Sequence, residues 1–403
     1  MNTSAAFDPE TRRVVEQLLS ESWRGEVRSG SVQSLRAGKV YRLEIVEAPP
    51  GSPPTVVVKA AAPEPGISVD PDATDGNPAQ LLLEEWAGLA FLNAALPGKG
   101  LVPAFYGGDR GRCLVVSEDF GPGSTLVDVL TGDDPEQART SLTMHAQAIA
   151  ELHAGTVGLE DQYRNIRDSL GPAGVPRDWK QYGIVLDTQG WGDLRSLRSE
   201  LQAGFARVGQ VVPGAFWDEY ESLASSLENP SPFRTYVQND ACPDNTLFTS
   251  GGVHLVDFER GGYHLSMLDA AYCRLGMPHC FWAGRVPEDV TTAAEMAYRD
   301  VLSAAIPAVA EDRLFGRAMT EACAYWIISN GDWLIHRGFE NDFDWGSATR
   351  RQRVFFRLEQ FAAATEQFSH LPSLGAAARE TIRRLRRQWE YRPMPLFPAF
   401  LDR

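Results

Sequence analysis

The pattern of hydrophobic and polar positions changes period several times in the first 120 residues. Apolar residues at helical spacing predict a short amphipathic helix over 9–22. Three strand-like runs follow, and the turn-forming residues between them predict an antiparallel meander over 32–38, 40–46 and 55–61. A longer helix is expected over 80–96, ended by a proline and a glycine. Two further strands are expected near VPAFYGG and RCLVVSEDF.

From about residue 119 onward the chain is predicted to be mostly helical. Apolar residues recur at helical spacing over 136–154, and the chain after residue 290 has helical character almost to its end. Strand-like pieces return only at 234–238, 245–249 and 253–258. The sequence therefore predicts an α+β protein with a strand-rich N-terminal lobe over 1–117 and a larger helical lobe over 118–403. This bilobal layout is typical of kinases.

Composition and charge narrow the classes of protein to consider. Hydrophobic residues make up 43% and charged residues 23% of the 403 positions, which is a balance typical of globular domains. The net charge of −15 argues against a nucleic acid or an anionic membrane as the main partner. No apolar run in the sequence approaches the ~18 residues of a membrane span, and the N-terminus has no signal pattern. We therefore expect a cytoplasmic protein.

The cysteines favour the same compartment. They number five, which is odd, and no two are spaced as CxxC. Free thiols in a reducing compartment are the simplest interpretation. On this view Cys242 is a small packing residue.

The strongest chemical signal is the segment QNDACPDNTLF (238–248), followed by HLVDFE (254–259). Phosphoryl transfer requires a carboxylate that accepts the proton of the attacking hydroxyl, and oxygen ligands that hold Mg²⁺ against the phosphates. Asp240 and Asn245 keep the D-x₄-N spacing of a kinase catalytic loop, and Asp257 arrives after a short hairpin. The hairpin is expected to bring Asn245 and Asp257 together from neighbouring strands. The sequence thus predicts a kinase that uses ATP and Mg²⁺.

These residues resemble the signature of the aminoglycoside phosphotransferase and choline-kinase-like superfamily of small-molecule kinases. That signature reads roughly H-G-D-x-H-P-x-N-hydrophobic, followed by a hydrophobic run that ends I-D-[FW]-E. The resemblance implies a protein-kinase-like bilobal fold. It also implies that Asp240 is the catalytic base and that Asn245 and Asp257 are the Mg²⁺ ligands.

Three residues of the loop depart from the family pattern. Gln238 stands where the family has His, Asn239 where it has Gly, and Cys242 where it often has His. Asn is the non-glycine residue best able to adopt positive φ, so Asn239 is expected to replace the turn glycine. Farther along, Asp269 resembles a family aspartate that braces the loop. Because every residue with direct chemistry is retained, activity is expected.

The N-terminal lobe offers residues for the nucleotide. Lys59 ends the third strand run, much like the kinase lysine that contacts the α- and β-phosphates. Such a lysine needs a counter-charge, and the helix over 80–96 offers both Glu84 and Glu85. Glu85 is preferred because leucines flank it at i−3, i+4 and i+7, which makes an unpaired carboxylate costly. The turn at Gly38 lies where a phosphate-covering loop belongs.

The strand end at SEDFG resembles the family's hinge between the lobes. There Glu118 and Phe120 would lie where the backbone meets the adenine edge, although an acidic strand end would have the same sequence. His153 is expected to be a packing residue rather than a catalyst. By resemblance, residues 1–117 bind the nucleotide, and residues 118–403 carry the catalytic loop, the metal site and the acceptor site.

Acidic and aromatic residues lie close together near the end of the chain. They are Asp332, Trp333, Asp342, Asp344 and Trp345. Acids beside aromatic walls suit a cationic or polyhydroxylated ligand, and they equally suit a helix end with packed tryptophans. If they bind the acceptor, it is an aminoglycoside-like antibiotic, an amino sugar or an amino alcohol.

The expected function is therefore ATP-dependent transfer of a phosphoryl group to a hydroxyl of a small molecule. The alternative is a catalytically silent member of the same fold that binds a nucleotide or another ligand. A protein kinase is disfavoured because the chain has no H-R-D or A-P-E motif and no long activation segment after Asp257.

Overall fold

The computed structural model describes residues 7–73, 77–171, 194–333, 339 and 341–401, and it divides into two compact units. The first unit comprises Met1–Gly123, Leu159–Arg177 and Leu247–Gly261, and the remaining residues form the second unit. The sequence pattern assigned everything after residue 117 to the second lobe. Two later segments, Leu159–Arg177 and Leu247–Gly261, nevertheless group with the first unit. A local hydrophobic pattern predicts which element a segment forms, but not which unit that element joins.

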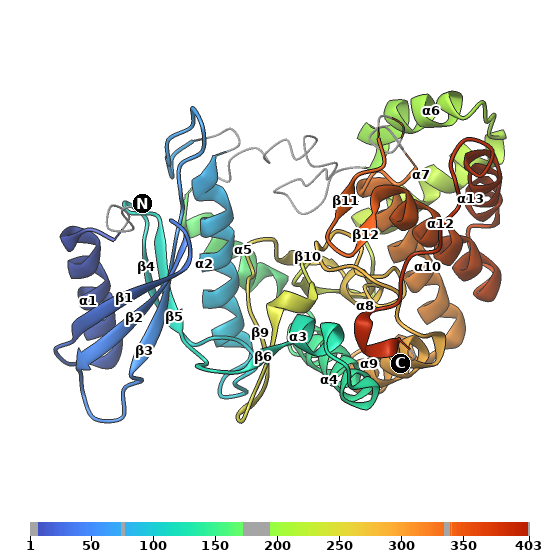
Figure 1. Cartoon of the computed structure of the whole chain (residues 1–403). Coiled ribbons are helices and arrows are strands. Elements are labelled where there is room, and N and C mark those ends of the chain that lie inside the picture. Colours follow the sequence, from blue (N-terminus) through green and yellow to red (C-terminus); the bar gives the residue numbers. More distant parts are fainter. Residues whose placement is uncertain (1–6, 74–76, 172–193, 334–338, 340, 402–403) are drawn as a thin grey trace. The chain divides into compact units, whose positions relative to one another are not determined.

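The first unit is built on an antiparallel sheet with the strand order β1-β2-β3-β5-β4 (Figure 1). Helix α1 begins where the Asp8 side chain accepts a hydrogen bond from the Thr11 N–H at 2.7 Å, with Pro9 in the first helical position. The elements of this unit are α1 (Pro9–Trp23), β1 (Arg28–Arg36), β2 (Val40–Glu47), β3 (Thr55–Ala60), α2 (Pro78–Ala95), β4 (Phe105–Asp109), β5 (Leu114–Glu118) and α5 (Glu160–Ser169), together with β8 (Thr246–Thr249), which starts at its border, and β9 (Gly252–Leu255).

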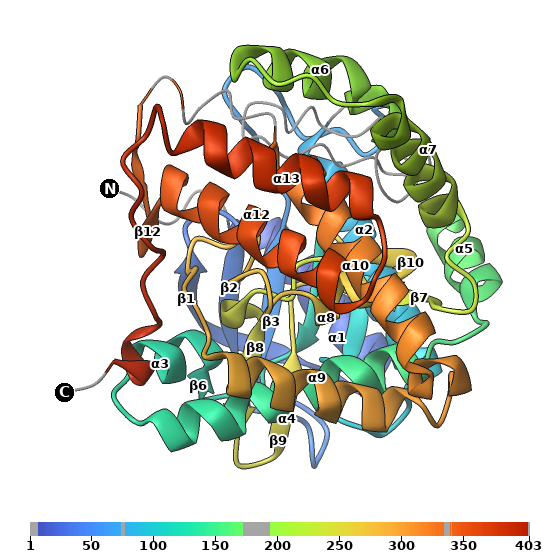
Figure 2. The same ribbon diagram turned by 90° about the vertical axis from the view of Figure 1, so that its right-hand side faces the viewer.

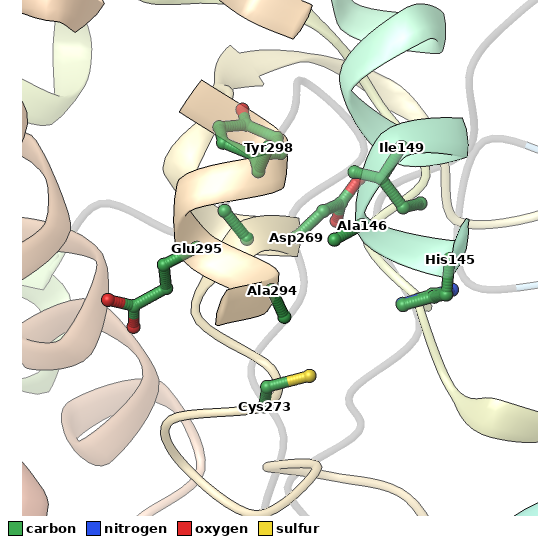
Figure 3. Close-up of a pocket in the computed structure, with 9 residues that line it drawn as sticks. His145, Ala146, Ile149, Asp269, Cys273, Ala294, Glu295 and Tyr298 are labelled. Atoms are coloured by element: carbon green, nitrogen blue, oxygen red, sulfur yellow. The ribbon is translucent and has the colours of Figure 1, made fainter. Parts of the chain in front are cut away.

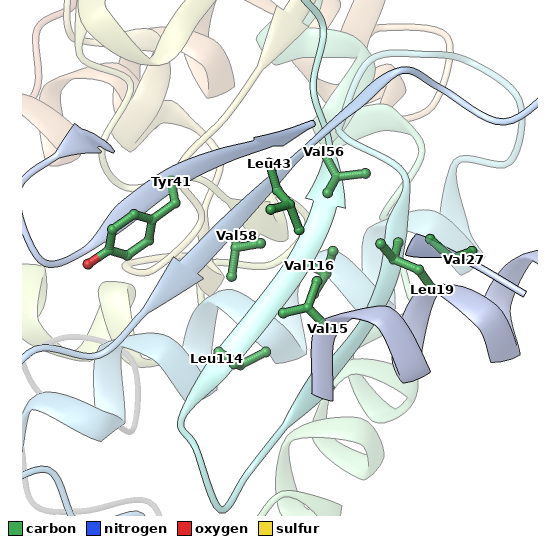
Figure 4. Close-up of a cluster of buried hydrophobic side chains, with 9 residues drawn as sticks. All are labelled: Val15, Leu19, Val27, Tyr41, Leu43, Val56, Val58, Leu114 and Val116. Atoms are coloured by element: carbon green, nitrogen blue, oxygen red, sulfur yellow. The ribbon is translucent and has the colours of Figure 1, made fainter. Parts of the chain in front are cut away.

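A single apolar layer holds α1 against the sheet (Figure 4). Alternate residues of the central strands point into this layer, as the period-two pattern of the sequence predicts. Its fully buried members are Val15, Leu19, Val27, Tyr41, Leu43, Val56, Val58, Leu114 and Val116. The layer fixes β3, and with it the position of Lys59 at the end of that strand.

The second unit is mostly helical. Helices α4 and α9 pack side by side, as do α12 and α13 (Figure 2). Its elements are β6 (Ser124–Thr125), α3 (Leu126–Thr131), α4 (Pro135–Ala154), α6 (Arg198–Arg207), α7 (Gly214–Glu228), β7 (Arg234–Val237), β10 (Gly262–Leu265), α8 (Met267–Ala270), α9 (Glu288–Leu302), α10 (Asp312–Ser329), β11 (Asp344–Trp345), β12 (Ala348–Thr349), α12 (Arg350–Gln367) and α13 (Pro372–Leu385), with 3₁₀ turns at Leu194–Leu197, Pro243–Asn245, Pro307–Ala310 and Pro398–Phe400.

The predicted fold class is confirmed as α+β, with an antiparallel sheet in the first unit and a mostly helical second unit. The pattern missed β10, which pairs antiparallel with β7 and is buried at all four positions, so it shows no alternation. Among the described helices, none combines the length and the hydrophobicity needed to cross a lipid bilayer.

Candidate active site

The predicted catalytic loop follows β7 and is held through its main chain. Asn239 adopts a φ of 56°, which confirms that it occupies the left-handed conformation expected of the turn residue. The backbone N–H groups of Gln238 and Asn239 donate to the two carboxylate oxygens of Asp269, at 2.7 and 2.9 Å. A buried carboxylate that accepts two main-chain N–H groups fixes the conformation of the turn. The bracing role predicted for Asp269 is therefore confirmed, and Asp240 is the next residue on the braced turn.

A second set of contacts holds Asp269 itself. His153 on α4 places Nε2 3.2 Å from the Asp269 carboxylate, and its Nδ1 lies 2.8 Å from the hydroxyl of Tyr298 on α9. His153 is fully buried, as expected of a packing residue. The structure adds that its ring links the brace to two helices, which orients the Asp269 carboxylate toward the loop.

Asp240 has a close partner that the sequence did not indicate. Its Oδ1 atom lies 3.0 Å from Nε2 of His279, and His279 is 9% exposed. The two segments are also joined covalently, because Cys242, two residues after Asp240, forms a disulfide bond with Cys280, the residue after His279.

The disulfide corrects the cysteine interpretation. The expectation of free thiols is wrong for Cys242 and Cys280, and Cys242 is a cross-link rather than only a packing residue. Cys113, Cys273 and Cys323 are free and buried. The bonded cysteines are 38 positions apart, so only the tertiary structure reveals that they meet.

Asn245 ends the 3₁₀ turn of the loop, directly before β8. Its side-chain Nδ2 donates to the backbone carbonyl of Asp240 at 2.8 Å. Because the amide nitrogen is engaged in this way, the amide oxygen is the atom that a cation would meet. Asn245 thus fits the donor set of a Mg²⁺ site, in which amide and carboxylate oxygens are the preferred ligands.

A small pocket lies beside the brace (Figure 3). Its volume is about 20 Å³, which is room for about one water molecule. The pocket is lined by His145, Ala146, Ile149, Asp269, Ala270, Cys273, Ala294, Glu295 and Tyr298. It is too small to receive a sugar or an amino alcohol, so it is not an acceptor site.

Lys59 lies among three carboxylates of the first unit. Its Nζ atom is 2.5 Å from Asp257, 3.0 Å from Glu259 and 3.3 Å from Glu85. Burial opposes the charged form, but the negative charges of the three acids outweigh burial and hold the pKa of Lys59 well above its usual value. Three carboxylates for one ammonium group make these four side chains negative overall, which fits a divalent cation as a further partner.

Glu84 serves a different contact from its neighbour. It accepts hydrogen bonds from Arg167 Nε at 2.7 Å and from the Tyr163 hydroxyl at 3.0 Å. The two adjacent glutamates of α2 therefore face different partners: Glu84 pairs with α5, and Glu85 lies next to Lys59. The distances agree with the preference for Glu85, whose role toward a nucleotide stays a prediction.

The predicted hinge and phosphate-covering turn both lie in the first unit. Glu118 ends β5, and its carboxylate accepts the backbone N–H of Ala104 at 3.0 Å. Phe120 stacks on His254, with ring centroids 3.8 Å apart. Gly38 has a φ of 73° in the turn between β1 and β2, a conformation that favours glycine.

The acidic-aromatic stretch near the end of the chain contains two kinds of residue. Asp332 and Trp333 are fully buried: Asp332 lies 3.4 Å from Arg357, and Trp333 packs against aromatic rings. These surroundings favour the packed helix end over an acceptor-binding surface. Asp342 and Asp344 are exposed, and Asp342 accepts hydrogen bonds from Thr349 Oγ1 and the Arg351 N–H, both at 3.0 Å. Trp345 ends β11, and its side chain lies outside the described part of the chain.

No family model and no curated protein matches the chain. Solved structures of small-molecule kinases are similar to it in fold. The choline kinase LicA from Streptococcus pneumoniae is 13% identical over 88% of this chain and 99% of its own, with a TM-score of 0.43. A choline/ethanolamine kinase family protein from Mesorhizobium loti is 15% identical over 87% of this chain and 93% of its own, also with a TM-score of 0.43.

A third solved structure is the streptomycin–ATP–APH(2″)-IIa ternary complex. It is 13% identical over 83% of this chain and 94% of its own, with a TM-score of 0.42. At such identities the similarity concerns the fold, so the roles of individual residues are argued below from the chain's own contacts.

Proposed function

We propose that this protein is an ATP-dependent phosphotransferase that phosphorylates a hydroxyl group of a small molecule. The observation that carries the proposal is the braced loop, in which Asp269 accepts the N–H groups of Gln238 and Asn239 and Asp240 follows on the fixed turn. A base that removes a proton in a phosphoryl transfer must be positioned before the reaction begins. The brace supports this role because it fixes the backbone and leaves the chemistry to Asp240.

The proposed roles divide between the two units. Asp240 accepts the proton of the attacking hydroxyl, and Asn245 and Asp257 supply the amide and carboxylate oxygens for Mg²⁺. Lys59, oriented by Glu85, holds phosphate oxygens of the nucleotide. Mg²⁺, when bound, would neutralise charge on the transferred phosphoryl group. Glu118, Phe120 and Gly38 remain the proposed hinge and covering turn, as the sequence predicts.

The proposed acceptor carries an amino group beside its hydroxyl, as an aminoglycoside, an amino sugar or an amino alcohol does. Phe281 and Trp282, respectively 50% and 37% exposed, directly follow Cys280, which is bonded to the catalytic loop. Exposed aromatic rings so near the proposed base suit a cationic ligand. Asp342 and Asp344 remain candidates for additional charge contacts. The sequence predicts a cytoplasmic location, which would supply the ATP, whereas the Cys242–Cys280 disulfide is of a kind that is rare in that reducing compartment.

The experiment is a panel assay of ADP release from Mg-ATP with each acceptor class, on wild type and on Asp240→Asn. We expect turnover with at least one amine-bearing acceptor, and a loss of roughly 10²–10⁴ in kcat in Asp240→Asn, the usual contribution of a positioned base. Asp244→Asn is the matched control, since Asp244 is an exposed acid of the same loop. It should retain near-normal turnover.

Two outcomes would contradict the proposal. Near-normal turnover in a folded Asp240→Asn variant would remove Asp240 from the role of base. Binding of Mg-ATP without ADP release for any acceptor in the panel would favour the silent member of the fold. A neutral sugar that outperforms every amine would leave the phosphotransferase in place and change only the acceptor class.

A further inference from the structure

His279 and Asp240 come from distant parts of the second unit and meet within hydrogen-bonding distance. The His279 Nε2 and Asp240 Oδ1 atoms are 3.0 Å apart, with the side chains respectively 6% and 18% exposed. Neither residue's neighbours in sequence predict the contact. A carboxylate with one oxygen held in this way has a fixed rotation, so the direction of its second oxygen is also defined.

The contacts of Tyr272 and Asp240 indicate which ring nitrogen of His279 carries the proton. The Tyr272 hydroxyl lies 3.1 Å from the backbone carbonyl of Asn239 and 3.2 Å from Nδ1 of His279. A hydroxyl has one proton, so it donates to either the carbonyl or the ring nitrogen. If it donates to Nδ1, the neutral ring carries its proton on Nε2. An ionised Asp240 only accepts hydrogen bonds, so its 3.0 Å contact selects the tautomer with the proton on Nε2, in which Nδ1 accepts the Tyr272 hydroxyl proton.

The segment that carries His279 is fixed on two sides. Cys280 is bonded to Cys242, two residues after Asp240. From the other side, Arg353 of α12 donates to the backbone carbonyls of Cys280 at 2.7 Å and Phe281 at 2.9 Å. The disulfide therefore joins the loop to a segment that α12 already anchors.

We propose that His279 is a positioning residue for the base, and that the Cys242–Cys280 disulfide keeps it there. His279 donates Nε2–H to Asp240 and holds the carboxylate in the orientation that meets the acceptor hydroxyl. This inference rests on the proposed function, because it needs Asp240 to be the base. If the disulfide holds His279 in place, turnover depends on whether Cys242 and Cys280 are bonded or reduced.

Reduction of the disulfide is the step that tests the tether. Dithiothreitol gives two electrons and two protons to the disulfide, which becomes two thiols, and the reagent closes to its own cyclic disulfide. The freed sulfur of Cys242 would lie with Asp240 and His279 in a group whose donor atoms are within 4.8 Å of one another. Reduced samples therefore need a zinc-selective chelator, so that a trapped metal ion is not mistaken for loss of the tether.

The first experiment compares His279→Ala with His279→Gln in the panel assay. We expect His279→Ala to lower kcat by about 10-fold to 100-fold, the range for losing a hydrogen bond to a charged group, with the KM for ATP within about twofold of wild type. Gln carries an amide N–H that can replace the donor, so His279→Gln should recover kcat to within a few-fold of wild type. His370→Ala is the control, because His370 pairs with Glu321 elsewhere in the unit.

The second experiment measures kcat of wild type and His279→Ala with and without dithiothreitol and the chelator. If the disulfide acts through His279, reduction lowers the wild-type kcat several-fold and leaves His279→Ala unchanged. Reduction requires no substitution, so this arm stays informative even where a cysteine variant would not fold.

Each result decides the inference separately from the function. Wild-type kcat in His279→Ala, together with an inactive Asp240→Asn, overturns the role of His279 and leaves the kinase proposal intact. No recovery in His279→Gln overturns donation to Asp240. Equal losses on reduction in wild type and His279→Ala overturn the tether. An active Asp240→Asn contradicts the proposed function itself.

Discussion

Two charge clusters, one in each unit, have opposite signs; the one in the second unit is almost fully buried, and the one in the first is partly exposed. In the first unit one ammonium group, that of Lys59, lies among three carboxylates. In the second unit one carboxylate, that of Asp332, lies 3.4 Å from Arg357 and 3.9 Å from Arg350. A third arginine, Arg353, lies on α12 with these two. Each cluster concentrates charge of one sign away from water, which is costly without compensation.

The two clusters differ in what compensates the surplus. The guanidinium groups donate to main-chain carbonyls: Arg350 to Asn330 at 2.9 Å, and Arg353 to Cys280 at 2.7 Å and Phe281 at 2.9 Å. These carbonyl oxygens belong to the fold itself, so main chain compensates most of the arginine cluster, although the buried Nε of Arg357 has no hydrogen-bond partner among the described residues. Burial, with Arg357 and Arg350 nearby, lowers the pKa of Arg353 to about 8, which indicates the cost of gathering these cations.

Carboxylates only accept hydrogen bonds, so carbonyl oxygens cannot compensate them, although the backbone N–H of Phe258 donates to Glu85. Burial raises the pKa of Glu85, and the positive charge of Lys59 opposes that shift. A divalent cation is the natural additional partner for such a cluster. The two clusters thus differ in what their excess charge does. The excess positive charge of the arginines holds main-chain carbonyls in place, and the excess negative charge around Lys59 is suited to bind a ligand.

Among the substitutions that test this comparison, Lys59→Met is expected to lower the free energy of unfolding most. Removing the ammonium group leaves Glu85, Asp257 and Glu259 without their shared cation, and removing one partner of a buried pair costs about 3–5 kcal/mol. We expect the free energy of unfolding, measured by urea denaturation, to fall by that amount. Millimolar MgCl₂ should restore more stability to Lys59→Met than to wild type.

Lys99→Met is the matched control, because Lys99 is exposed. It should change the free energy of unfolding by less than about 0.5 kcal/mol. If Lys59→Met is equally silent, or if it gains nothing from Mg²⁺, the negative surplus does not attract a divalent cation.

A smaller effect is expected from Asp332→Asn. The distances from Asp332 to Arg357 and Arg350 are long, and the guanidinium groups keep their carbonyl partners, so we expect a loss of about 1–3 kcal/mol in the free energy of unfolding. The KM for the acceptor should not change. Asp344→Asn, at an exposed acid of the neighbouring hairpin, should leave stability within about 0.5 kcal/mol.

The opposite result would support acceptor binding by the acidic-aromatic stretch. A raised acceptor KM in Asp332→Asn with unchanged stability would mean that Asp332 faces a ligand rather than the arginines.

A further effect is a pH dependence that arises in the second unit. Burial lowers the pKa of His145 to about 4 and that of His264 to about 3. Below pH ~6.5 the unfolded chain binds protons that the folded chain does not, so the free energy of unfolding falls as the pH drops. The slope reaches about 1.4 kcal/mol per pH unit for each histidine, and the loss from His145 is complete near pH 4.

Urea denaturation of wild type and His145→Asn at pH 7.5, 6.5, 5.5 and 4.5 measures this slope. The variant should lose stability less steeply below pH 6.5, because one of the two neutral histidines is gone. Identical slopes would mean that His145 is protonated in the folded state as readily as in the unfolded chain.

Local patterns were sufficient for most of the first unit. In helix α1 and in strands β2 and β3, the buried side chains recur at the spacing expected of a helix or a strand. A short stretch of sequence therefore contains the whole hydrophobic pattern that predicts each of these elements. The loop around Asp240 was predictable for a similar reason: D-x₄-N and the following hairpin lie within about twenty residues. Asn239 could be placed because few residues other than glycine adopt positive φ.

The remainder depends on contacts between distant residues. His279 approaches Asp240 across 39 positions, and neither residue's neighbours carry a pattern for this contact. The same holds for Cys242 and Cys280. Asp332 is a different case, since an acid beside a tryptophan looks the same in sequence whether a ligand or an arginine faces it. Only its burial against α12 separates the two.

The brace at Asp269 has a consequence for how the loop tolerates substitution. It binds main-chain N–H groups at 238 and 239, which every residue except proline possesses. The side chains there are thus irrelevant to the brace, provided that position 239 tolerates positive φ. A loop held in this way keeps its geometry without help from the side chain at position 238. Gln238 and Asn239 stand where the signature that the loop resembles has His and Gly, and both keep the N–H groups that Asp269 accepts.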